Sequence, residues 1–296
     1  LASLSVANGD KASAIAAHAA KANIHVQASR YEQAIEDVEA LVQLGAFSEA
    51  KNPAQILVER MPRSPNAWVH LAGVAIGLRE YDRALDACEK AREFSAKPSA
   101  ALLFLEATAL GSLGRREEAV RPAAEAASLL SSHGDVQSAL LLILAHLLTA
   151  AEVLDVVDRA SRMSAPGTAL LATRALALSA LGRPEEALAC AELIREDKEW
   201  SAGTSDYIKG RVLQTGGHYE EAVRAFDKLL AGKAAGFQVE AEREIALACL
   251  GQHGPRMEAL PAALVRVAVQ GEDPAHSSQL CLLTAQDALR RGDAGV

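Results

Sequence analysis

The stretch that decides the fold covers residues 65–98, PNAWVHLAGVAIGLREYDRALDACEKAREFSAKP. Its large apolar residues recur at helical spacing, and small residues stand between them. Trp68 and Leu71 precede the small Ala72 in a first helix, and Ala84 stands early in a second helix. Small side chains let two helix backbones approach closely, whereas a larger residue would overpack the pair at about 1–3 kcal/mol. The stretch therefore predicts two antiparallel helices that pack through their small residues.

The early small residue of the second helix recurs along the chain at nearly constant spacing. It falls at Ala14, Ala50, Ala84, Ala119, Val153, Ala187, Ala222 and Ala259, with successive separations of 36, 34, 35, 34, 34, 35 and 37 residues. A turn is expected five residues earlier, at Gly45 and Gly114 for example, and at Gly9-Asp10 near the N-terminus. One helix pair cannot bury its own apolar stripe, so neighbouring pairs stack into a continuous core.

The quoted stretch resembles a tetratricopeptide repeat, whose pattern is W-x2-L-G-x2-Y, then A-x3-F, then A and P. Trp68, Leu71, Ala72 and Ala84 match that pattern, and Cys88 stands in its aromatic place. The resemblance implies an all-α fold, a right-handed α-solenoid of stacked antiparallel helix pairs with about eight repeats including partial ends.

We expect one array over 1–296. It comprises a partial unit over 1–30, then units over 31–64, 65–98, 100–133, 134–167, 168–201 and 203–236, an irregular unit over 237–275, and a partial unit over 276–296. A last helix is expected over about 275–291. Because both ends lie inside repeats, we expect a covalent continuation into further repeats or domains.

Composition restricts the classes of function. Half of the residues are hydrophobic and only 4% are aromatic, which suits closely packed helices. The net charge of −8 argues against a nucleic-acid partner, and no apolar run reaches the roughly 18 residues of a membrane span. Four cysteines without paired spacing indicate small core residues in a reducing, cytoplasmic compartment. No phosphate loop, metal-ligand spacing or catalytic motif occurs, so we expect no cofactor, no metal and no enzymatic activity.

The family resemblance implies a protein or peptide partner, bound in a concave groove lined by the first helix of each pair. The residues expected in this peptide groove are His70, Gly73, Ile76, Gly77, Phe104, Leu105, Thr108, Gly111, Leu142 and His146. The charges with which chaperone-binding members of the family clamp a carboxylate are absent from the corresponding places. Two explanations of the glycines stay open: tight helix packing, or a low groove floor that lets a ligand backbone approach.

Basic residues occupy equivalent places in three successive C-terminal units. Arg174, Lys209 and Arg243 are separated by 35 and 34 residues, and Arg211 stands near them. Stacked repeats would set these side chains in a basic line that could bind an acidic segment. The alternative is that they pair with neighbouring acids such as Glu242 and Glu244, with little energetic effect.

The sequence therefore favours a scaffold that binds a protein segment. One alternative is the substrate-recruiting repeat region of a larger enzyme of the glycosyltransferase, sulfotransferase or hydroxylase type. The other is a structural module that associates with itself, which would give a symmetric dimer.

Overall fold

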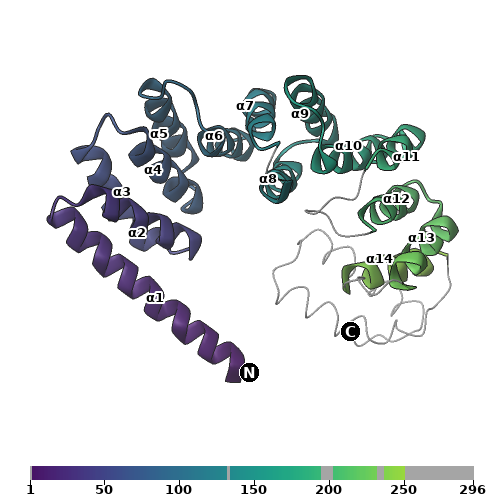
Figure 1. The fold of residues 1–296 in the computed structure, drawn as a ribbon, viewed down its shortest axis with the longest axis horizontal. Coiled ribbons are helices and arrows are strands. Elements are labelled where there is room, and N and C mark those ends of the chain that lie inside the picture. Colours follow the sequence, from purple (N-terminus) through teal and green to yellow (C-terminus); the bar gives the residue numbers. More distant parts are fainter. Residues whose placement is uncertain (1, 132–133, 195–202, 232–236, 251–296) are drawn as a thin grey trace. The chain divides into compact units, whose positions relative to one another are not determined.

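The protein was analysed as a computed structural model, which describes residues 2–131, 134–194, 203–231 and 237–250. Every regular element in these ranges is an α-helix (Figure 1), and within each of the two units described below consecutive helices pack against one another. The chain divides into two compact units: unit 1 is Leu1–Pro166 and unit 2 is Gly167–Val296. The predicted all-α solenoid of helix pairs is confirmed. Residues 251–296, with the helix expected over 275–291, lie outside the described residues.

Unit 1 holds a long first helix and four helix pairs. The first helix, α1 (Ala2–Gln27), packs on α2 and α3. The pairs are α2 (Tyr31–Gln43) with α3 (Phe47–Arg60), α4 (Pro65–Gly77) with α5 (Tyr81–Glu93), α6 (Ala100–Ser112) with α7 (Arg116–Leu129), and α8 (Gly134–Leu147) with α9 (Ala150–Met163). Neighbouring first helices, α2 with α4, α4 with α6 and α6 with α8, also contact each other, and α9 packs on α7.

Unit 2 contains the described helices of the C-terminal part. They are α10 (Thr168–Ala180), α11 (Pro184–Glu192), α12 (Thr204–Thr215), α13 (Tyr219–Ala231) and α14 (Phe237–Cys249). α10 packs on both α11 and α12, while α13 packs on both α12 and α14. Among the described residues of this unit, the largest fully buried side chain is Phe226 of α13.

The recurring small residues form the interior of the helix pairs. Ala50, Ala84, Ala119, Ala187 and Ala222 are all completely buried. Val153, the larger residue at this place in the fourth pair, is also buried. The predicted close approach of the two helices at these places is therefore confirmed over the described pairs.

The expected turn at Gly9-Asp10 is wrong. α1 is one continuous helix through both residues. A glycine inside a helix costs only about 1 kcal/mol relative to alanine, and the alanine-rich sequence on both sides of Gly9 favours helix. The helix is held to α2 at its other end, where His18 Nδ1 and His25 Nδ1 each lie 2.8 Å from a carboxylate oxygen of the buried Asp37.

The turn inside the described helix pairs, except that between α8 and α9, uses the left-handed backbone conformation. Gly114 adopts it with φ of +77°, and the corresponding residue of the preceding pair, Arg79, adopts it with φ of +61°. A residue with a Cβ is strained in this conformation by about 1–2 kcal/mol, whereas glycine adopts it freely. Arg79 is exposed, and its side chain makes no hydrogen bond or ion pair with the described residues.

Arg79→Gly is expected to raise the free energy of unfolding by about 0.5–1 kcal/mol, because relief of strain exceeds the extra backbone entropy of glycine. The reciprocal change Gly114→Arg should lower it by about 1–2 kcal/mol. A Cβ at Gly114 would meet no atom within 4 Å, so strain alone is tested there. Urea denaturation followed by circular dichroism measures both. Shifts of the same sign in the two variants would contradict this explanation.

Candidate functional site

The first helices α4 and α6 bring part of the expected groove together. Ile76 of α4 and Phe104 and Leu105 of α6 are half-buried, so they keep apolar surface in contact with solvent. A Cβ added at Gly73 would lie 4.0 Å from Leu105 Cδ2 and would meet no other atom within 4 Å. We call this surface of Gly73, Ile76, Phe104 and Leu105 the apolar face.

The other two glycines of the predicted groove have a packing role. A Cβ at Gly77 would lie 2.2 Å from the ring of Phe47, which begins α3 of the preceding pair. A Cβ at Gly111 would lie 3.0 Å from Leu147 Cβ, at the end of α8. Both glycines therefore make room for a side chain of a neighbouring pair. Of the two explanations left open by the sequence, tight packing accounts for Gly77 and Gly111 and does not account for Gly73.

The expected polar groups of the groove differ in availability. Burial, opposed by the nearby Glu39 of α2, lowers the pKa of His70, so its half-buried imidazole is neutral at neutral pH. Thr108 is buried, and its hydroxyl donates to the carbonyl oxygen of Phe104 at 2.8 Å. This hydroxyl is thus used within α6, and His70 is the better polar contact for a ligand.

Two expected groove residues belong to α8. His146 is exposed in the last turn of that helix. The side chain of Leu142 lies outside what the structure describes.

The predicted basic line contains residues that take part in ion pairs within unit 2. Arg211 Nη1 donates to Oε1 of the buried Glu242 at 2.7 Å. Arg243 pairs with Asp227 and donates through Nη1 to Glu244 Oε1 at 2.9 Å. These contacts correspond to the pairing alternative, in which the arginines neutralise neighbouring acids. Arg174 and Lys209 are half-buried.

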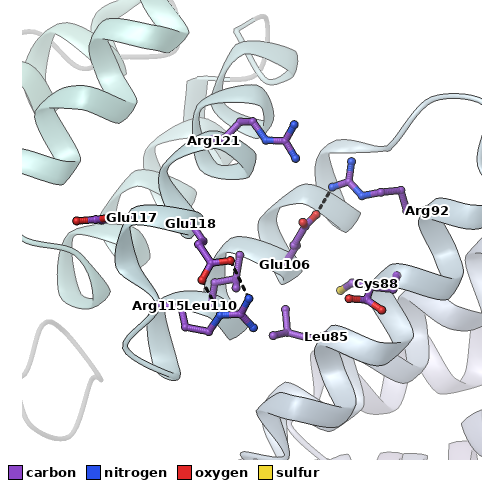
Figure 2. Close-up of a pocket in the computed structure, with 10 residues that line it drawn as sticks. Leu85, Cys88, Arg92, Glu106, Leu110, Arg115, Glu117, Glu118 and Arg121 are labelled. Carbon is purple, nitrogen blue, oxygen red and sulfur yellow. Dashed lines mark hydrogen bonds and ion pairs between the residues drawn. The ribbon is translucent and has the colours of Figure 1, made fainter.

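A cavity of about 410 Å³ lies between α5, α6 and α7, on the side of the second helices (Figure 2). Arg92 of α5 pairs with Glu106 of α6, and Arg115 donates to Glu118 at 2.8 and 2.7 Å. The sequence argument missed this site because it considered only first-helix surfaces. The sequence did contain an indication of the cavity. The repeat place that holds the long Lys51 in the preceding pair holds the shorter Leu85 in the pair of α4 and α5.

Cysteine chemistry does not mark a site in the described chain. Cys88 is buried at the cavity, and burial, followed by the effect of Glu106, raises the pKa of its thiol to about 12. Cys190 is half-buried and Cys249 is exposed, so the expectation of core cysteines is wrong for Cys249. Cys281 lies outside the described residues.

Searches for other kinds of site gave two negative findings. Across the described ranges, no group of three or more His, Cys, Asp or Glu side chains could hold a metal ion. None of the helices in that part of the chain is long and apolar enough to cross a membrane.

No protein-family model matches the sequence, and no curated protein matches it. Solved structures do match. A tetratricopeptide repeat protein from Parabacteroides merdae covers 86% of this chain and 98% of its own, with 14% identity and a TM-score of 0.55. The apo form of RapI covers 94% of this chain and 99% of its own, with 12% identity and a TM-score of 0.49. YrrB, a tetratricopeptide repeat protein with an unusual peptide-binding site, covers 74% of this chain and 95% of its own, with 15% identity and a TM-score of 0.41.

The Parabacteroides structure matches over most of both chains, and its fold agrees with the consecutively packed helix pairs described above. The chain therefore has the tetratricopeptide-repeat fold.

Proposed function

We propose that this chain is a protein-interaction scaffold that binds a polypeptide segment on the apolar face of α4 and α6. The observation that supports this most directly is the open space above Gly73, which is bordered by Leu105 alone. Glycine within a helix is less favourable than alanine by about 0.8–1.0 kcal/mol, and no neighbouring side chain requires it at this position. A close approach by a ligand would account for it.

The chemistry of the face suits a peptide with bulky apolar residues. Ile76, Phe104 and Leu105 offer partly exposed hydrophobic walls, and His70 lies on the same helix as Gly73. Apolar residues of a bound segment would lose contact with water against these walls, and the neutral imidazole would fix its orientation through a hydrogen bond. The net charge of −8 favours a protein partner over a nucleic acid. The proposed role is binding, and it assigns no reaction to the chain.

Gly73→Leu is expected to weaken peptide binding by at least about tenfold, because the new side chain occupies the space in which the ligand backbone would lie. Stability should be kept, since a Cβ there makes only an ordinary contact with Leu105. The probes are peptides selected from a displayed random library against the wild-type chain, with affinities measured by fluorescence anisotropy.

Asp86→Leu is the matched control, because it places the same side chain on the exposed surface of α5. It should bind the selected peptides with wild-type affinity. Equal affinities for Gly73→Leu and the wild type, at equal melting temperatures, would refute binding on the apolar face.

A further inference from the structure

Two successive gaps between helix pairs have the same architecture and differ in what fills them. The first gap lies between α3, α4 and α5, and the second gap lies between α5, α6 and α7. The first gap leaves a space of only about 20 Å³, whereas the second leaves about 410 Å³. Because the repeat places are known, the residues responsible for this difference can be compared one by one.

Two hydrogen-bonded contacts close the first gap. Lys51 of α3 extends across it, and its Nζ donates to Glu80 Oε1 at 2.6 Å. Arg83 of α5 donates through Nη2 to Gln55 Oε1 of α3 at 3.3 Å. A long basic side chain of the protein itself therefore occupies the first gap, and the places of Gln55 and Arg83 face each other across it.

The corresponding places of the second gap, 34 or 35 residues later, cannot make these contacts. Leu85 replaces Lys51, and Arg115 replaces Glu80. Glu89 replaces Gln55 and Glu118 replaces Arg83, so two carboxylates take the places that are hydrogen-bonded in the first gap. Two carboxylates repel each other and have no proton to share at neutral pH.

Arg115 is directed to Glu118 on its own helix pair, as Figure 2 shows, and makes no hydrogen bond to α5. Glu89 forms no hydrogen bond or ion pair with the described residues. Arg115 interacts with Glu89 only through its charge, so among the described residues no hydrogen bond joins Glu89 to Glu118 and the second gap stays open.

The second gap offers both parts of a site for a long basic side chain. Leu85 and Leu110 line it and can cover an aliphatic stem, while Glu89 and Glu118 lie at the places where a cation would join the two helix pairs. The electrostatic surroundings of Cys88, which lines the cavity, also favour a cationic ligand. The thiol of Cys88 has its pKa raised by burial, and Glu106 and Glu89 raise it further while Arg92 alone opposes them.

We propose that the second gap is a binding site for an arginine side chain of a partner protein, which takes the place that Lys51 takes in the first gap. Its stem lies on Leu85 and Leu110, and its guanidinium donates to Glu89 and Glu118. Arginine fits better than lysine because its planar group presents five donors and can bond two carboxylates together. This second docking site shares α6 with the apolar face but uses other residues of that helix, Glu106 and Leu110, and does not depend on the apolar face.

The alternative is an acidic ligand. Arg121 of α7 lines the same cavity and forms no ion pair among the described residues. Its guanidinium lies toward the end of the cavity where Arg92 is held by Glu106 (Figure 2). The cavity is lined by four glutamates and three arginines, and two of those arginines are already paired with glutamates, so the basic ligand is favoured.

The test uses three blocked pentapeptides, Ser-Ala-X-Ala-Ser, in which X is arginine, its uncharged isostere citrulline, or glutamate. Chemical shifts of backbone amides in α5–α7 report binding to the whole chain. We expect the arginine peptide to bind with a Kd of about 1 mM or below and the other two to bind at least about tenfold more weakly.

Glu89→Gln should weaken binding of the arginine peptide by at least about tenfold, because it removes the negative charge of a carboxylate that forms no hydrogen bond within the described part of the protein. Asp86→Asn, which removes an exposed acid of α5 outside the cavity, should leave its affinity unchanged. Leu85→Lys should abolish binding, because the lysine side chain then occupies the gap and its ammonium group competes with the ligand for Glu89.

Three results would overturn the proposal. The first is equal affinity for the arginine and citrulline peptides, or no chemical-shift change with either. The second is tighter binding of the glutamate peptide, and the third is wild-type affinity of Glu89→Gln for the arginine peptide. Gly73→Leu should bind the arginine peptide normally, so failure of this site and failure of the apolar face are distinguishable.

Discussion

Replacing Phe226 with alanine is expected to lower the free energy of unfolding of α12 and α13 by about 3–5 kcal/mol. The ring is completely buried, and its centroid lies 6.2 Å from that of Tyr207. It packs with Ala222 and Ala246 in the core of unit 2. Alanine would remove this apolar surface and leave a cavity, because the surrounding helices can relax only in part. Native-state hydrogen exchange should show that amide protection is lost first in α12 and α13, since stability in a repeat array is local.

A cycle of variants identifies the partner of the Phe226 ring. A Cβ at Gly210 of α12 would lie 2.5 Å from the ring, so Gly210→Ala alone should destabilise the pair by about 1–3 kcal/mol. In a Phe226→Cys background the methyl group would fill vacated space, and Gly210→Ala should then be neutral or stabilising. If the free-energy changes of Gly210→Ala and Phe226→Cys add in the double variant to within about 0.5 kcal/mol, the small size of residue 210 is not required by the ring of Phe226.

The sequence predicted the helix pair of α12 and α13 through the small Ala222, and the structure shows how two other places of the repeat differ there. In unit 1 the small place holds Ala72 and the aromatic place holds Cys88, and both are buried. In unit 2 the same places hold Gly210 and Phe226, a smaller residue opposite a larger one. The glycine thus makes room for part of the larger ring opposite it, although the two residues together are larger than the alanine and cysteine of unit 1. The period of 34–37 residues was recognisable because the early small residue of the second helix is retained in most repeats.

Features that depend on neighbouring repeats could not be predicted from the pattern. The sequence shows Gly77 as a glycine on a first helix, but its neighbour Phe47 lies 30 residues earlier, in another pair. The second gap likewise depends on how residues of two helix pairs bond, because Arg115 bonds Glu118 within its own pair and Glu89 of the preceding pair forms no hydrogen bond with the described residues. The continuity of α1 was missed for a different reason. The spacing of the marks assigned a turn to Gly9, whereas local helix propensity was sufficient to continue through it.

Gly77→Leu is expected to lower the free energy of unfolding by about 1–3 kcal/mol or more, in contrast to Gly73→Leu on the same helix. A Cβ at Gly77 would lie 2.2 Å from the Phe47 ring, so either the ring or the end of α4 must move. The new residue would also be favoured by helix propensity at about 0.8 kcal/mol, which offsets only part of the strain. Circular dichroism during urea denaturation measures the loss.

Phe47→Ala supplies the decisive comparison for Gly77→Leu. Removing the ring should make the leucine at position 77 tolerable, so the double variant should be more stable than the sum of the single changes predicts, by at least about 0.5 kcal/mol. Peptide binding to the apolar face should survive in the double variant, because Gly73 is unchanged. If Gly77→Leu instead keeps wild-type stability and abolishes peptide binding, then Gly77 belongs to the groove floor with Gly73, and the close contact with Phe47 is not what requires a glycine there.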